Sequence, residues 1–145
     1  MSLKQDLAVE NIKNGFNCAQ SVLSVFSDSY GLDKKIALKT AGGLGGGVRS
    51  GEICGAVSGA VLVIGLKYGQ CTAGDFESKS ICNAKTVEFL NEFKAKNNFV
   101  VCRDILQCDI STEEGFEQAK SKNLFKTTCV DMVKSAVSIL EELGY

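Results

Sequence analysis

The fold is decided by residues 42–69, GGLGGGVRSGEICGAVSGAVLVIGLKYG. A glycine-rich run at residues 42–47 is followed by a segment that is almost entirely apolar over residues 53–66. Helices that are apolar on all sides lie in the middle of a bundle. The sequence therefore predicts a central apolar helix over residues 52–68, preceded by a glycine-rich stretch.

Three glycines, Gly51, Gly55 and Gly59, recur at four-residue spacing along the start of this helix. Residues four apart share one face of a helix. That face carries no side chains, so another backbone or a cofactor can approach it closely. Each glycine inside a helix costs roughly 1 kcal/mol relative to alanine, which close packing would offset. We take these glycines and the nearby Arg49 as candidate cofactor-binding residues.

A glycine run before a helix can also cradle a phosphate, because free N–H groups and the helix dipole favour negative charge. The known patterns do not fit. After Gly43-Leu44-Gly45 the dinucleotide pattern requires a third glycine where Val48 stands, and no Gly-Lys-Ser/Thr follows. We interpret the run as a loop that permits close contacts, and Arg49 could pair either with an anion or with a solvated carboxylate.

Helical apolar spacing continues on both sides of the central helix. Asn17, Asp33 and Asp75 stand where they can cap helices. Sustained alternation of apolar and polar residues is absent, and Phe99–Val101 is the only candidate for a strand. We expect an all-α, single-domain helical bundle over residues 1–145. The further predicted helices cover about residues 7–14, 17–30, 33–38, 75–96, 112–123 and 126–143, with a short segment at 100–106.

The composition removes several classes of function. Among 145 residues there are seven Cys, no His and no Pro, with a formal net charge of −1. Without histidine the chain cannot build a Cys-His or Ser-His-Asp nucleophile or a His-containing zinc site. The near-neutral charge, with no basic run, predicts no nucleic-acid partner.

The chain shows no targeting or membrane signal. Its N-terminus lacks the features of a secretory signal. The longest apolar stretch, residues 56–66, is shorter than the roughly 20 residues that cross a bilayer. We expect a cytoplasmic protein that does not span a membrane.

No two of the seven cysteines form a C-x-x-C pair. This argues against thioredoxin-like motifs and zinc ribbons, and a reducing cytoplasm disfavours a structural disulfide framework. Any cysteine site must therefore be assembled from separate helices. Cys71, Cys82 and Cys108 are expected to be accessory. Four others lie on apolar stripes or helix starts and are expected to face one shared interior: Cys18, Cys54, Cys102 and Cys129.

Cys18 and Cys54 are predicted in the first turn of a helix, where the macrodipole and unpaired N–H groups lower a thiol pKa and favour the reactive thiolate. Arg49, five residues before Cys54, would add to this effect. Cysteine is also a small residue that is often simply buried. A packing role for all four cysteines therefore stays open.

Residues 42–69, with Cys54-Gly55-Ala56-Val57-Ser58-Gly59 at their centre, resemble the C-GCAxxG-C-C family of redox-active proteins. Residues 17–23, 102–106 and 129–133 resemble its other three cysteine segments. The chain differs from the family label in one place, because it has Cys-Gly-Ala where the label has Gly-Cys-Ala.

The resemblance implies a redox role. It also implies that the family's four characteristic cysteines correspond to Cys18, Cys54, Cys102 and Cys129. It also implies a bacterial or archaeal source and a functional link to a transporter.

Three hypotheses remain open from the sequence. The first is a thiol redox protein, of the thiol-disulfide oxidoreductase type, in which a thiolate at Cys54 or Cys18 attacks and a second cysteine of the four resolves. It needs no cofactor, and its partner would be a redox protein or a small thiol or disulfide. The second is a zinc or iron–sulfur site held by the same four cysteines. The third is a helical interaction subunit with core cysteines. An all-apolar central helix in so small a chain is also compatible with a homodimer.

Overall fold

The computed structural model describes all residues 1–145, and it is all-α, as expected. No strand forms; the only β-type pairing is one isolated antiparallel bridge between Ile53 and Val101. Short 3₁₀ turns cover Ser27–Tyr30 and Leu124–Lys126. The helices are α1 (Leu3–Lys13), α2 (Cys18–Leu23), α3 (Lys34–Thr40), α4 (Gly55–Tyr68), α5 (Phe76–Asn97), α6 (Cys102–Leu106), α7 (Glu113–Ser121) and α8 (Thr128–Glu142).

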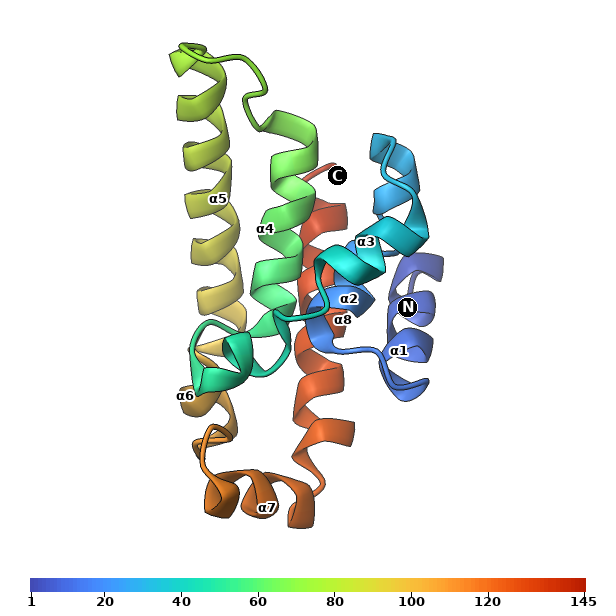
Figure 1. Ribbon diagram of the computed structural model, residues 1–145, viewed down its shortest axis with the longest axis vertical. Coiled ribbons are helices and arrows are strands. Elements are labelled where there is room, and N and C mark those ends of the chain that lie inside the picture. Colours follow the sequence, from blue (N-terminus) through green and yellow to red (C-terminus); the bar gives the residue numbers. More distant parts are fainter.

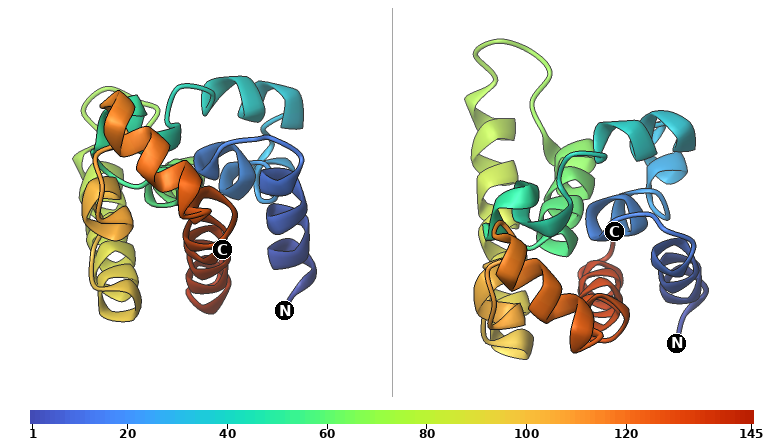
Figure 2. Two further views of the ribbon diagram at one scale, coloured as in Figure 1. Left: turned by 90° about the horizontal axis from the view of Figure 1, so that it is seen from below. Right: turned by 60° about the horizontal axis from the view of Figure 1, so that its bottom comes forward.

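The long helices α4, α5 and α8 pack against one another, and α2 and α1 complete the bundle on the other side (Figure 1). Helix α2 lies against both α4 and α8, and α1 lies against α8. The short helices α6 and α7 close the lower end in this view, where α7 runs across the molecule (Figure 2). No helix is both long and apolar enough to cross a membrane.

The predicted helix caps at Asn17, Asp33 and Asp75 are confirmed. Each side-chain oxygen accepts a hydrogen bond from the backbone N–H three residues later, which satisfies one of the free donors at a helix start. At α2 the pattern is a reciprocal capping box, because the Gln20 side chain also accepts from the Asn17 N–H at 2.9 Å. Helix α1 begins earlier than predicted, since Ser2 caps it through the N–H of Gln5 at 3.1 Å.

Two further predicted helix boundaries were wrong. Residues 17–30 do not form one helix, because α2 ends at Leu23. The buried Ser24 accepts a hydrogen bond from the Asn11 amide at 3.0 Å, and Ser27 donates to the carbonyl of Ser24 at 3.3 Å. Serine side chains that bond to nearby groups in this way compete with regular helix hydrogen bonding.

The central helix starts at Gly55, with Cys54 as its N-cap, rather than at residue 52. The preceding residue, Ile53, is held in an extended conformation by its bridge to Val101. The candidate strand at residues 99–101 therefore does make a β-type contact, but this contact is a single bridge.

The core is one large cluster built around α4. Its fully buried large side chains include Ile64 from α4, Phe89 and Phe93 from α5, and Leu140 from α8. The two phenylalanine rings stack with centroids 6.0 Å apart. Helix α4 is central but not buried all round, because Leu66 is 36% exposed.

Gly59 sets the distance between α2 and α4. A Cβ atom added to Gly59 would lie 2.7 Å from the carbonyl oxygen and 3.0 Å from the Cα of Ala19. These are backbone atoms, which cannot swing away as a flexible side chain can. Gly65, on the same helix, has nothing within 4 Å of such a Cβ.

We therefore expect Gly59→Ala to destabilise the protein by about 1–3 kcal/mol through overpacking. Gly65→Ala is the matched control and should stabilise by about 0.5–1 kcal/mol, the helix-propensity gain of alanine. Urea unfolding followed by circular dichroism measures both. Equal effects of the two substitutions would contradict the proposed contact.

Candidate thiol site

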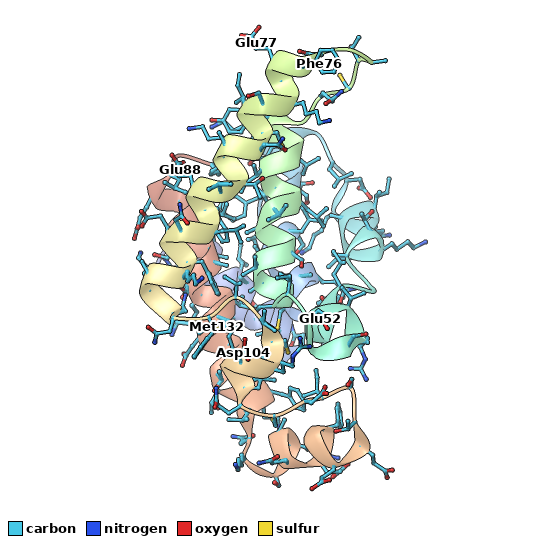
Figure 3. All side chains as sticks on the ribbon, turned by 90° about the vertical axis from the view of Figure 1, so that its left-hand side faces the viewer. Glu52, Phe76, Glu77, Glu88, Asp104 and Met132 are labelled. Atoms are coloured by element: carbon cyan, nitrogen blue, oxygen red, sulfur yellow. The ribbon has the colours of Figure 1, made fainter.

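The four cysteines selected from the sequence line a single cavity of about 560 Å³. They come from four different helix starts: Cys18 opens α2, Cys54 caps α4, Cys102 opens α6, and Cys129 lies in the first turn of α8. The structure thus brings the four together, as the sequence led us to expect. Figure 3 shows Met132, which lines the cavity, at the same end of the molecule as Glu52 and Asp104, far from Phe76 and Glu77.

Cys54 and Cys102 are brought close by the isolated bridge. The Cys54 N–H donates to the Val100 carbonyl at 2.8 Å, and the Cys102 N–H donates to the Glu52 carbonyl at 2.6 Å. Outside this bridge, Arg103 pairs with the Glu52 carboxylate at 2.8 Å and donates to the Gly51 carbonyl at 3.2 Å. Backbone pairing and this ion pair therefore fix the two cysteines relative to each other.

Cys18 is positioned by the residue before it. The Asn17 side-chain oxygen accepts from the Gln20 N–H at 2.8 Å, and its amide donates to the carbonyls of Ala41 and Gly42 at 3.2 and 3.1 Å. The start of α2 is thus tied to the beginning of the glycine-rich stretch. From this position the Cys18 thiol donates a hydrogen bond to Cys129 across the α2–α8 contact.

The hydrogen bond between Cys18 and Cys129 shifts the pKa values of the two thiols in opposite directions. It lowers the pKa of Cys129, because the donated hydrogen stabilises the thiolate. The same contact, together with burial, raises the pKa of Cys18 well above its usual value. The two sulfurs therefore titrate as a coupled pair, in which the contact favours the thiolate at Cys129 and the protonated thiol at Cys18.

Burial dominates at the other two cysteines. It raises the pKa of Cys54 to about 11 and that of Cys102 to about 12. At Cys54 the amides of Ala56 and Val57 at the start of α4 act in the opposite direction, but they are outweighed. The expectation that helix starts would lower the pKa of Cys18 and Cys54 was wrong. At Cys18 the contact with Cys129 and burial both raise the pKa, and at Cys54 desolvation of the thiolate outweighs the effect of the helix terminus.

Arg49 lines the cavity from a left-handed turn. Gly46, Gly47, Val48 and Arg49 have φ values of 64°, 63°, 59° and 55°. Glycine adopts this conformation freely, whereas a β-branched residue such as valine rarely does. A Cβ on Gly47 would collide with the backbone of Glu52. The Arg49 guanidinium lies 5.8 Å from the centre of the ring of Phe116, a residue that does not itself line the cavity.

Of the three glycines proposed to make room for a cofactor, only Gly55 lines the cavity. A Cβ there would lie 3.1 Å from the Cβ of Cys18. Gly51 instead faces Arg103 and Asp109, and Gly59 faces the backbone of Ala19. The spacing of four residues did not keep the three on one surface, since Gly51 precedes the helix and has φ +70°.

Several lining residues carry no signal in the sequence. Lys13 ends α1, and Lys126 ends the 3₁₀ turn before α8; both line the cavity together with Phe125 and Met132. A lysine near a helix end normally faces water, so only the tertiary arrangement shows that these two border a site.

The other three cysteines lie outside the cavity. Cys71 is exposed, and Cys82 is half-buried against the main core. Cys108 is half-buried beside the small cluster that contains Cys102. No group of three or more Cys, Asp or Glu side chains is arranged so that it could hold a metal ion. The cysteines as placed therefore do not fit the zinc or iron–sulfur hypothesis.

A protein-family model described as "Putative redox-active protein (C_GCAxxG_C_C)" matches residues 16–143. The match spans all four cysteines of the cavity and nearly the whole chain. No curated protein and no solved structure matches this sequence.

We expect Cys18→Ala to raise the pKa of Cys129, because the substitution removes the donated hydrogen bond. At pH 7 fewer Cys129 thiols would be ionised, and alkylation by iodoacetamide should slow about tenfold, since a hydrogen bond to a charged group contributes about 1.5–3 kcal/mol. Peptide mass spectrometry after timed alkylation at several pH values measures this. The control is Cys82→Ala, which removes a half-buried thiol outside the cavity. An unchanged pH profile for Cys129 in Cys18→Ala would contradict the coupling.

The strained turn gives a second expectation. Val48→Gly should stabilise the protein by about 1 kcal/mol, because it relieves a left-handed valine. Val87→Gly is the control, since Val87 on α5 and Val48 are exposed to a similar extent, 55% and 53%. Glycine in the middle of a regular helix should destabilise by roughly 0.5–1 kcal/mol. Thermal unfolding compares the two, and a loss of stability in both would argue against strain at Val48.

Proposed function

The chain belongs to the C_GCAxxG_C_C family of redox-active proteins, and on that premise we propose that Cys129 and Cys18 form a dithiol pair that exchanges with a disulfide substrate. Cys129 is the attacking thiolate and Cys18 is the resolving thiol. The observation that carries the proposal is that these two thiols meet in the wall of one cavity, and the lowered pKa of Cys129 supports it.

Thiol–disulfide exchange requires a thiolate that is accessible and a second thiol within reach. Cys129 is half-buried on the cavity wall, so it is shielded but not sealed off. Cys54 and Cys102 have pKa values of about 11 and 12 and are therefore protonated at neutral pH. This favours Cys129 over Cys54 as the first nucleophile.

The reaction balances without a cofactor. The Cys129 thiolate attacks one sulfur of the substrate disulfide; the S–S bond breaks, and the departing thiolate takes a proton from water. Cys18 then loses its proton to water and attacks the Cys129 sulfur. The second substrate half leaves as a thiolate and is protonated in turn. The substrate has gained two electrons, and the protein has formed a Cys18–Cys129 disulfide.

The direct test is to treat the reduced protein with hydroxyethyl disulfide, quench with iodoacetamide and map the cysteines by mass spectrometry. We expect a Cys18–Cys129 disulfide. In Cys18→Ser a mixed disulfide should accumulate on Cys129, because the resolving thiol is missing. In Cys129→Ser the first step should slow at least tenfold, since the remaining cavity thiols have raised pKa values. Cys71→Ser, which changes an exposed cysteine outside the cavity, is the matched control and should behave as the parent.

Two outcomes would contradict this function. If Cys129→Ser formed adducts as fast as the parent, Cys129 would not be the nucleophile. If the anaerobically purified protein held one equivalent of zinc or an iron–sulfur cluster, the four cysteines would be ligands instead.

A further inference from the structure

Three positive side chains border the thiol cavity from three different elements. They are Lys13 at the end of α1, Arg49 in the left-handed turn, and Lys126 at the end of the 3₁₀ turn before α8. All three are exposed. No Asp or Glu is among the residues that line the cavity. In a chain with a formal net charge of −1, this is a local concentration of positive charge.

None of these three cations is paired with a carboxylate of the protein, and the Arg49 guanidinium lies over the Phe116 ring. The ion pairs of the structure are Lys85–Glu88, Lys96–Glu142 and Arg103–Glu52. Lys13, Arg49 and Lys126 also donate no side-chain hydrogen bond to another residue, whereas Arg103 does. Their charges are therefore available to a molecule that enters the cavity.

Two long helices add to the positive potential. Helices α4 and α8, of 14 and 15 residues, have no side-chain hydrogen bond at their N-caps. Residues at both starts, Gly55 and Cys129, line the cavity. The dipole of each helix start favours a negatively charged group nearby, and at α4 the amides of Ala56 and Val57 already interact with the Cys54 sulfur.

The remaining walls are largely apolar and include Phe16, Ile105, Ile110, Phe125 and Met132. The volume of about 560 Å³ falls within the range of roughly 300–1,000 Å³ typical of small-molecule sites. A folded protein could offer its disulfide to the recessed Cys129 only on a protruding segment. A small molecule can enter the cavity whole.

We infer that the substrate of this cavity is a small disulfide that carries carboxylates, held by Lys13, Arg49 and Lys126 while its sulfur meets Cys129. This inference rests on the function proposed above and names its substrate class. The same cations also stabilise the thiolate that departs when Cys129 attacks, because that product carries one more negative charge than the thiol it becomes.

The test compares three small disulfides of different charge: glutathione disulfide, which is net negative; hydroxyethyl disulfide, which is neutral; and cystamine, which is positive. The rate at which each forms the Cys18–Cys129 disulfide is divided by its rate with free 2-mercaptoethanol, which removes differences in intrinsic reactivity. We expect the normalised rate to be about tenfold higher for glutathione disulfide than for hydroxyethyl disulfide, a typical factor for attraction of a charged substrate. Cystamine should be slowest, and added salt should reduce the spread.

The variant that tests the residues is Lys13→Gln/Arg49→Gln/Lys126→Gln. It should lose the preference for glutathione disulfide, measured as the ratio of the normalised rate with glutathione disulfide to that with hydroxyethyl disulfide. The matched control is Lys34→Gln/Lys35→Gln/Lys39→Gln on α3, which removes the same number of charges from exposed residues outside the cavity. The control variant should keep the preference.

The outcomes separate the two proposals. Equal normalised rates for the three disulfides, or an unchanged preference in the cavity triple variant, would overturn the substrate class and leave the dithiol pair intact. If a protein disulfide oxidised the Cys18–Cys129 pair and none of the small disulfides did, the substrate class would also be overturned and the dithiol pair would stand. If no disulfide formed the Cys18–Cys129 bond, the proposed function would fall together with the inference.

Discussion

The close approach of α2 to α4 is the contact on which the rest of the structure depends. Gly59 has no Cβ, so the backbone of Ala19 lies where a side chain would otherwise stand. One turn earlier, Gly55 leaves room for Cys18 beside the start of α4. Helix α8 packs against both α2 and α4, so this spacing also determines where Cys129 lies. The close packing of the α2 and α4 backbones therefore helps to determine the positions of the cysteines in the thiol site.

The site is assembled from parts that are distant in the sequence, since its cysteines stand at positions 18, 54, 102 and 129. Three of the four are placed by contacts that their own helices do not supply. Cys54 and Cys102 depend on the pairing of the Glu52 and Val100 carbonyls with their N–H groups, and Cys18 depends on the ties from Asn17 to Ala41 and Gly42. The acidity of Cys129 is consequently a property of the folded chain as a whole.

Much of this arrangement could be predicted from local chemistry. The caps at Asn17, Asp33 and Asp75 are side-chain effects over three residues, and they were found where the sequence places them. The convergence of the four cysteines follows from apolar stripes that must face a common interior. Local patterns could not predict the tertiary contacts. The bridge from Ile53 to Val101 moved the start of α4, and the positions of Lys13 and Lys126 at the cavity depend on how α1 and the turn before α8 approach the cysteines.

The pKa of each cysteine was the property hardest to predict from the sequence, because the effect of burial is larger than the effect of a helix terminus. A helix terminus contributes about 0.3–1 kcal/mol to a nearby charge at an exposed position, whereas burial can shift a thiol by several times that. At Cys54 burial therefore prevails, although the cysteine caps a long helix. Among the four cavity cysteines only Cys129 has a lowered pKa, because Cys18 donates to its sulfur, and this contact and burial together raise the pKa of Cys18. Neutral thiols at Cys18, Cys54 and Cys102 also spare the Cys129 thiolate from repulsion, because each would oppose it if it were ionised. The cavity thus favours one negative sulfur at a time, which is the charge state from which a single exchange step can begin.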